Sequence, residues 1–205
     1  SRAFFIKPRS FNTYSWNHIG RLMAGATSSI GHTETVDRVK GMPLAAAALA
    51  AVTAGRDHID YRQLLVVDAN GGRAIHSGQQ VLGIWGEATG QDCAAGGNLL
   101  ADAGVPSAMV TAFERATGHL GDRLMAALQA GLSAGGEAGP VHSAGLRIAD
   151  RLSWPLVDLR CDWTDSCPIQ AVETAWQIYK PQMAAYVQRA MDPTQAPSYG
   201  VPGDE

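Results

Sequence analysis

Two short stretches of this chain place residue types used in hydrolytic and ligand-binding sites beside glycine-rich turns. His142 and Ser143 follow a glycine-rich segment and open a predicted strand, where side chains can face a binding site. Gly96 and Gly97 precede Asn98, and glycine lets backbone N–H groups approach an oxyanion closely. Each stretch also has a structural interpretation. Ser143 can be a small residue packed against the next strand, with His142 facing solvent at the strand end, and the glycines can form a plain tight turn; the sequence leaves these alternatives open.

Apolar and charged residues alternate between positions 157 and 162. Val157, Leu159 and Cys161 fall on one phase, which predicts one buried face and one charged face. The charged phase consists of Asp158, Arg160 and Asp162. An exposed ladder of ion pairs and a charged ligand site are both consistent with this row. Because Cys161 lies on the apolar phase, we expect it to be a small core residue.

Metal-binding and cofactor motifs are missing from the sequence. The six histidines never fall four residues apart on one predicted helix, and the three cysteines form no Cys-x-x-Cys pair. Phosphate-binding Gly-x-x-x-x-Gly-Lys loops and His-Glu-x-x-His helices are absent as well. We therefore expect no protein-bound metal, no cofactor and no disulfide framework.

The composition argues against several kinds of partner. The 16 Lys and Arg residues are interleaved with 19 Asp and Glu residues and form no basic stripe, so we expect no nucleic-acid partner. No run approaches the roughly 18 to 20 apolar residues that span a bilayer, and no secretory signal is evident, which predicts a cytoplasmic protein without membrane contact. Charged residues make up only 17% of the chain, which predicts a homo-oligomer, most simply a dimer, that buries part of the surface.

The elements that must position these residues follow from apolar periodicity and from Gly and Pro breakers. We expect a helix from Pro43 to Gly55, a hairpin over 61–76 that turns at Asn70-Gly71, a loop over 85–90 and a strand over 92–95. Helices over 106–118 and 120–131 and strands over 142–149 and 155–163 should follow. The last helix should start near Pro168 with Asp165 or Ser166 as its cap, and Pro181 should interrupt it. This order fits a layered α+β sandwich better than a dinucleotide-binding fold. We expect a single domain over residues 1–191, followed by a Pro- and Gly-rich tail over 192–205.

The segment from Arg62 to Gly71, Arg-Gln-Leu-Leu-Val-Val-Asp-Ala-Asn-Gly, resembles the bacterial family catalogued as Domain of Unknown Function 1028. Further landmarks of that family follow in the same order: Gly78, Trp85-Gly86, Thr89-Gly90, Gly97-Asn98-Leu99-Leu100, Met109, Phe113, residues 124–131, Gly135-Gly136, His142-Ser143-Ala144 and Val157-Asp158-Leu159-Arg160. The match covers about residues 41–163, whereas residues 1–40 match the family poorly. The resemblance implies an N-terminal-nucleophile (Ntn) hydrolase-like αββα four-layer sandwich with antiparallel sheets.

In Ntn hydrolases the first residue of the mature chain attacks an amide carbonyl, and its own α-amine accepts the proton. The resemblance therefore implies Ser1 as the nucleophile, with backbone donors near Asn98 holding the oxyanion. The candidates for contact with the substrate are Arg62, Asp158, Arg160, His142 and Ser143. Together these implications predict an amidohydrolase for a small nitrogen-containing metabolite. A non-catalytic metabolite-binding or oligomer-building module on the same fold is the alternative, so enzymatic activity stays open.

Overall fold

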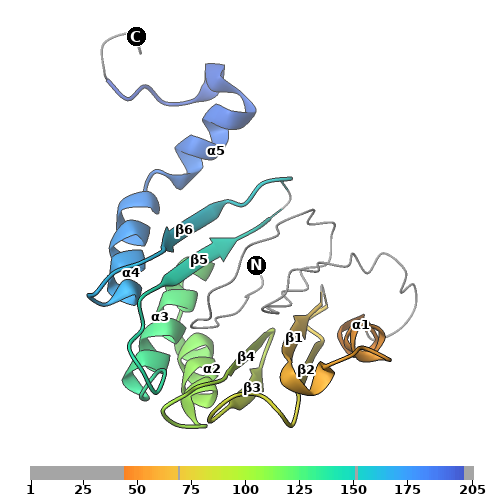
Figure 1. Ribbon diagram of the computed structural model, residues 1–205. Helices are drawn as coiled ribbons and strands as arrows, with labels where there is room; N and C mark the ends of the chain where they lie inside the picture. The colour runs from red at the N-terminus through yellow and green to blue at the C-terminus, as the bar shows by residue number, and fades with distance from the viewer. Residues whose placement is uncertain (1–43, 69, 151, 201–205) are drawn as a thin grey trace.

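A computed structural model describes residues 44–68, 70–150 and 152–200 of the 205-residue chain (Figure 1). The elements are α1 (Leu44–Thr53), β1 (Gln63–Val67), β2 (Arg73–Ser77), β3 (Gly86–Gly90), β4 (Cys93–Gly97), α2 (Val105–Arg115), α3 (Leu120–Ser133), β5 (Ala144–Ile148), β6 (Val157–Cys161), α4 (Pro168–Tyr179) and α5 (Met183–Met191). Short 3-10 helices precede β1 at Ile59–Tyr61 and follow α5 at Pro193–Gln195. The strands form three antiparallel hairpins, β1–β2, β3–β4 and β5–β6, which confirms the expected α+β class.

The first hairpin is covered on both faces. Every residue of β1 is buried, and strand alternation directs Leu64 and Val66 toward α1 while Leu65 and Val67 face β4. An apolar run without polar alternation is typical of a strand buried on two sides. Double burial also fixes the register, because a slip of one residue would exchange the two faces.

The second hairpin uses small residues to pack between the first hairpin and α2. Ala94 faces β1, while Cys93 and Ala95 face the main core beneath α2 and α3. Gly96 permits the close approach of the two hairpins, because a Cβ atom there would lie 3.2 Å from the Leu65 side chain. The packing therefore stacks four layers in the order α1, β1–β2, β3–β4 and α2 (Figure 1).

The glycines of this hairpin correct two expectations. The tight turn that the structural interpretation places at Gly96 and Gly97 is wrong, because both residues lie in β4 and pair with β3. The loop expected over 85–90 is also wrong, since β3 occupies Gly86–Gly90. The glycines at its ends reflect close packing: a Cβ atom at Gly86 would lie 2.3 Å from the Ala103 carbonyl oxygen on the approach to α2.

The third hairpin, β5–β6, packs on α3 and α4 (Figure 1). Leu146, Ile148 and Val157 are buried in the main core, and β6 alternates between residues packed on that core and exposed charged residues, as its sequence predicts. Trp176 of α4 fills this core with 0% of its surface exposed.

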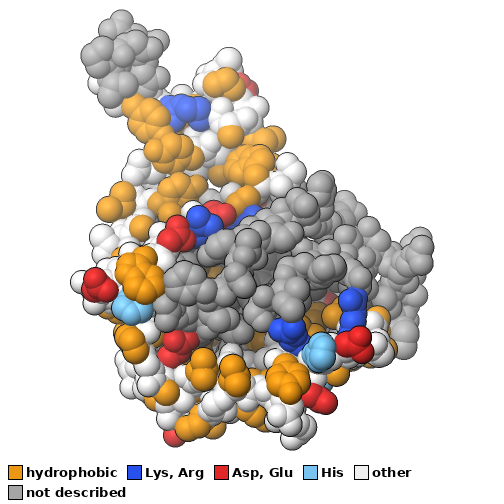
Figure 2. Space-filling model, in the orientation of Figure 1, with side chains coloured by type: hydrophobic (Ala, Val, Ile, Leu, Met, Phe, Trp, Pro, Cys, Tyr) orange, Lys and Arg blue, Asp and Glu red, His pale blue; other side chains and the backbone are white. Residues whose placement is uncertain are grey.

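Helix α5 is the least buried α-helix of the described chain. Helix α4 ends at Tyr179 and α5 begins at Met183, so the interruption expected at Pro181 is confirmed. No residue of α5 is buried, and the helix projects from the rest of the molecule in Figure 1. Figure 2 shows hydrophobic side chains gathered over α4 and α5. The exposed large apolar residues of this region are Ile178, Tyr186, Met191 and Tyr199.

The N-terminus of α4 differs from the expected cap. Its N-cap residue is Cys167, not Asp165 or Ser166, and the Cys167 side chain makes no capping hydrogen bond. Pro168 at the first helical position has no N–H group, so one fewer backbone donor at this helix end requires a capping acceptor.

Three general properties follow from the described part of the chain. Cys93, Cys161 and Cys167 are free thiols. Within the same ranges, no three His, Cys, Asp or Glu side chains are grouped as a metal site. None of the helices described has the length and apolar character needed to cross a membrane.

Candidate functional site

A polar cluster lies at one end of the layer between the first two hairpins. Gln63 on β1 is buried, and its Nε2 atom donates hydrogen bonds to Ser77 Oγ on β2 at 3.0 Å and to the Gly86 carbonyl oxygen at 3.1 Å. The Ser77 hydroxyl donates in turn to Glu87 Oε2 on β3 at 2.5 Å. We call Gln63, Ser77 and Glu87 the inter-sheet polar cluster.

Strand register explains why these three side chains meet. Gln63 pairs with Ser77 across the first hairpin, and Glu87 pairs with Gly96 across the second. Alternation places these pairs on the two faces that oppose each other, in phase with the apolar residues Leu65 and Ala94. A buried amide without partners costs about 1–3 kcal/mol, so its two hydrogen bonds let Gln63 replace an apolar residue there.

Two of the residues expected at a site lie at the same end of this stack. Arg62 is half-buried directly before β1, and its carbonyl oxygen accepts a hydrogen bond from the Gly78 N–H at 2.9 Å. Asn98 directly follows β4, and its Nδ2 atom donates to the Leu82 carbonyl oxygen at 3.4 Å. The expected nucleophile, Ser1, lies outside the described residues.

The backbone after Asn98 has a strained turn whose donors are already in use. Leu99 has a φ of 55°, a left-handed value that is rare for a residue other than glycine. The N–H groups of Leu99 and Leu100 donate to the carbonyl oxygens of Leu82 and Ile84 at 3.1 and 2.8 Å. An oxyanion role for this turn stays a prediction, and these two N–H groups do not support it.

His142 and Ser143 lie instead beside the third hairpin. The His142 Nδ1 atom is 2.8 Å from the Thr164 carbonyl oxygen, and its ring stacks on Trp163 with 4.2 Å between the ring centroids. The Thr164 N–H also donates to the His142 carbonyl oxygen, and a carboxylate oxygen of Asp165 lies 3.8 Å from His142 Nδ1. The His142 side chain is 18% exposed, so the solvent-facing position that the structural interpretation predicts for it is wrong. Ser143 is half-buried next to it.

The charged face of β6 forms a ladder of ion pairs. Arg147 on β5 lies 3.8 Å from Asp158, its partner in the register, and Arg160 lies 3.4 Å from Asp162, which directly follows β6. The side chains of Asp158 and Arg160 are 41% and 44% exposed. Of the two interpretations that the sequence leaves open, the contacts among described residues fit the exposed ladder.

Two further reactive side chains have structural roles. The buried Asp68 carboxylate accepts hydrogen bonds from the backbone N–H groups of Asn70 and Gly72 in the first hairpin and of Ala45 in the first turn of α1, at 2.7 to 3.0 Å. It thereby ties the hairpin to the helix N-terminus.

Burial, reinforced by the Glu114 carboxylate, raises the pKa of the Cys93 thiol, so this cysteine is a poor nucleophile.

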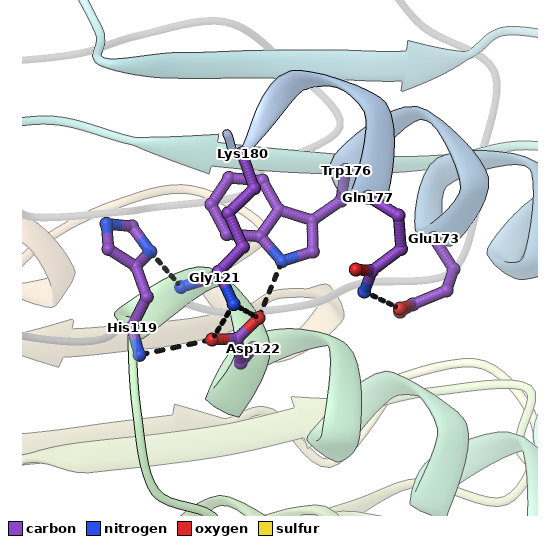
Figure 3. Close-up of polar contacts among 7 residues, drawn as sticks. All are labelled: His119, Gly121, Asp122, Glu173, Trp176, Gln177 and Lys180. Carbon is purple, nitrogen blue, oxygen red and sulfur yellow. Dashed lines mark hydrogen bonds and ion pairs between the residues drawn. The ribbon is translucent and has the colours of Figure 1, made fainter. Parts of the chain in front are cut away.

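A third polar arrangement joins α3 to α4 (Figure 3). Asp122 accepts hydrogen bonds from Trp176 Nε1 at 3.0 Å and from Lys180 Nζ at 2.8 Å, and it receives the backbone N–H of His119 at 3.1 Å. Burial pushes the pKa of the Asp122 carboxyl upward, but the hydrogen bonds from Lys180 and Trp176 outweigh it and lower that pKa below its ordinary value. The arrangement satisfies a buried indole and anchors two helices.

The sequence prediction of the site omits all three members of the inter-sheet polar cluster. Gln63 stands at the start of an apolar run, Ser77 ends a hairpin arm, and Glu87 falls in the segment expected to be a loop. The available signal is Gln63 itself, because a polar residue on the buried phase of a strand requires partners.

Comparisons with known proteins agree with the resemblance found in the sequence. The model of a family of unknown function, DUF1028, matches residues 24–172. The crystal structure of protein SPO2555 from Silicibacter pomeroyi, described as a member of the same family, superposes with a TM-score of 0.63 at 31% sequence identity. That match covers 70% of this chain and 62% of the other, so the chain spans less than two thirds of that protein's length. No curated protein matches the chain.

Proposed function

This chain belongs to the DUF1028 family, and from that premise we propose that it is an amidohydrolase acting on a small nitrogen-containing metabolite at the inter-sheet polar cluster. The observation that carries the proposal is the position of this cluster. Gln63, Ser77 and Glu87 are hydrogen-bonded at one end of a layer that is otherwise apolar. Concentrated polar groups beside a packed apolar layer are typical of small-molecule sites.

The order of the layers supports the Ntn type of hydrolase. Helix α1, the two hairpins and α2 stack as helix, strands, strands and helix, which is the layer order of an αββα sandwich. In the mechanism that the resemblance implies, Ser1 Oγ attacks the amide carbon while the α-amine accepts the hydroxyl proton. That proton then passes to the leaving nitrogen as the C–N bond breaks, and water hydrolyses the resulting ester. Ser77 and Glu87 would orient the nitrogen-bearing side of the substrate.

A non-catalytic metabolite-binding module is the second candidate. It is favoured by the turn after Asn98, where the N–H groups of Leu99 and Leu100 are engaged with other carbonyl groups. Amide hydrolysis needs donors aimed at the developing oxyanion, and removing a single one typically lowers kcat by about 100- to 1000-fold.

Hydrolysis of a panel of small amides, ureas and amidines, followed by release of amine or ammonia, tests the proposal. We expect turnover that Ser77→Ala lowers and that Ser1→Ala or acetylation of the α-amine abolishes. Ser107→Ala is the matched control, because Ser107 is an exposed serine on α2. Absence of turnover across the panel would favour the binding module. Activity that survives in Ser1→Ala but not in Ser77→Ala would move the nucleophile to Ser77.

We also propose that the chain forms a dimer through its C-terminal helices. Ile178 and Met191 are 62% and 61% exposed, and α5 buries no residue although a nine-residue helix is marginal on its own in water. Trp176 of α4 is fully buried and does not contribute to this surface. Light scattering at micromolar concentration should give twice the chain mass, and Met191→Glu should restore the monomer.

A further inference from the structure

We propose that Glu87 binds a cationic nitrogen group, an ammonium or a guanidinium, of the small molecule that this protein recognises. The inference rests on the proposed function for the location of the site and names the class of substrate. Glu87 is exposed on β3, and its carboxylate accepts one hydrogen bond, from Ser77. Within the described ranges, no Lys, Arg or His side chain forms an ion pair with it.

Three other carboxylates of the described chain have a basic partner, which Glu87 lacks. Asp122 is paired with Lys180 at 2.8 Å, Asp158 with Arg147 at 3.8 Å, and Asp162 with Arg160 at 3.4 Å. Glu87 therefore carries a charge that this part of the fold does not compensate. An external cation can supply that compensation.

The direction of the hydrogen bonds specifies what a ligand must bring. Gln63 Nε2 donates to both Ser77 Oγ and the Gly86 carbonyl oxygen, so its two N–H bonds are used inside the cluster. Because Ser77 Oγ already accepts from Gln63, its hydroxyl hydrogen is directed to Glu87. The donors of the cluster are thus used in hydrogen bonds within it, whereas the exposed carboxylate of Glu87 can accept further hydrogen bonds. A ligand group that binds to Glu87 must therefore carry N–H donors.

The same chain of bonds holds the carboxylate in position. Gln63 is 8% exposed and clamped between two strands, and it fixes Ser77, which in turn fixes one oxygen of Glu87. An acceptor held in place loses less side-chain entropy on binding than a free surface glutamate does. This arrangement favours recognition by Glu87 over a surface carboxylate that has no such support.

A matched pair of probes tests the inference without requiring turnover. Propylguanidinium and propylurea have the same planar shape, but only the first is charged. In NMR titrations of the full chain at constant ionic strength, propylguanidinium should shift the backbone amides around Ser77, Gly86 and Glu87 and bind at least about tenfold more tightly than propylurea, the lower limit for a charge-assisted hydrogen bond.

Variants locate the effect. Glu87→Gln should remove the preference for the cation, whereas Glu173→Gln, which changes a carboxylate on α4 that also accepts a side-chain hydrogen bond, should leave it intact. Unchanged urea midpoints would establish that both variants fold. Equal binding of the two probes, shifts confined to other strands, or a preference that survives in Glu87→Gln would overturn the inference. Cation binding without amide turnover would contradict only the proposed hydrolase, while turnover without a cation preference would contradict only the role of Glu87.

Discussion

In the stack formed by β1 to β4, polar side chains point into the layer between two hairpins, whereas in the β5–β6 hairpin they point outward from a single sheet. Gln63 is 8% exposed and has two hydrogen bonds of fixed direction. Arg160 is 44% exposed and lies beside Asp162, two residues further along the chain. The inner cluster depends on three strands keeping their register, but the outer ladder depends on long side chains that water also solvates.

From this contrast we expect the inner layer to carry function and the outer face of β5–β6 to tolerate substitutions. A change in the inner layer has to be absorbed by neighbouring backbone, because strands pack there from both sides. On the outer face of β5–β6, solvent can replace a lost partner. Substitutions matched between the two regions therefore test this difference.

The largest difference should come from two glycine substitutions. A Cβ atom at Gly78, directly after β2, would lie 2.1 Å from the Asp60 carbonyl oxygen and 2.5 Å from Asp60 Cα, both backbone atoms. Gly78→Ala should therefore destabilise the fold by about 2–3 kcal/mol. Gly145 on β5 has no contact closer than 3.5 Å, so Gly145→Ala should change stability by less than about 0.5 kcal/mol. Urea denaturation measures both, and equal midpoints would contradict the comparison.

The next effect concerns the anchor that holds α4 beneath the third hairpin. Replacing Asp122 with Asn removes the charge that pairs with Lys180 and one acceptor for the hydrogen bonds of Trp176 and Lys180, so we expect a loss of about 1–2 kcal/mol at pH 7. The folded-state pKa of Asp122 is lower than its ordinary value. Its contribution is therefore complete above the unfolded-state pKa and is lost as pH falls through the folded-state pKa.

Urea midpoints measured between pH 7 and about pH 3, which brackets the ordinary pKa of an aspartate, test this sign. The wild-type chain should approach the stability of Asp122→Asn at the acid end. A gap between the two proteins that stays constant with pH would mean that the carboxylate acts only as a neutral acceptor.

A smaller effect is expected from Ser77→Ala. The substitution removes the acceptor for one of the Gln63 N–H bonds and the donor to Glu87, so stability should fall by about 1 kcal/mol. The control, Ser107→Ala on the exposed surface of α2, should lie within about 0.5 kcal/mol of the wild type. Thermal unfolding of the two variants under identical conditions measures this difference. If the loss of stability in Ser77→Ala equals that in the control, the hydrogen bonds of the cluster do not stabilise the fold.

The sequence predicts those parts of the fold whose signal is local. Helical periodicity locates α2 and α3, Asn70-Gly71 locates the first hairpin, and alternation along 157–162 identifies the buried face of β6. Strand β3 could not be predicted, because Gly-Glu-Ala-Thr-Gly has no apolar or β-branched pattern of its own. Its extended form depends on pairing with β4 and on close packing against α2.

The candidate site was harder to predict for the same reason. Gln63 and Ser77 are 14 residues apart in sequence, and Ser77 and Glu87 are 10 apart, so no local motif contains the cluster. Hairpin register brings the first pair together, and the stacking of two hairpins adds the third residue. By contrast, Asp158 and Arg160 were conspicuous in the sequence because their spacing is local, and they form part of an exposed ladder.

The smallest effect should come from that ladder. Asp158 lies 3.8 Å from Arg147, and its side chain is 41% exposed, so the pair gains little from Coulomb attraction in water. Asp158→Asn keeps the shape of the side chain and removes its charge, and we expect a loss of stability below about 0.5 kcal/mol. Because exposed charges are screened, raising the salt concentration to about 1 M, where the Debye length is about 3 Å, should shrink the loss further. Urea midpoints at low and high salt make the comparison. A loss above about 1 kcal/mol that salt does not reduce would mean that Asp158 acts in a shielded site, and the outer face of β6 would then regain the role of a ligand site that its sequence also allows.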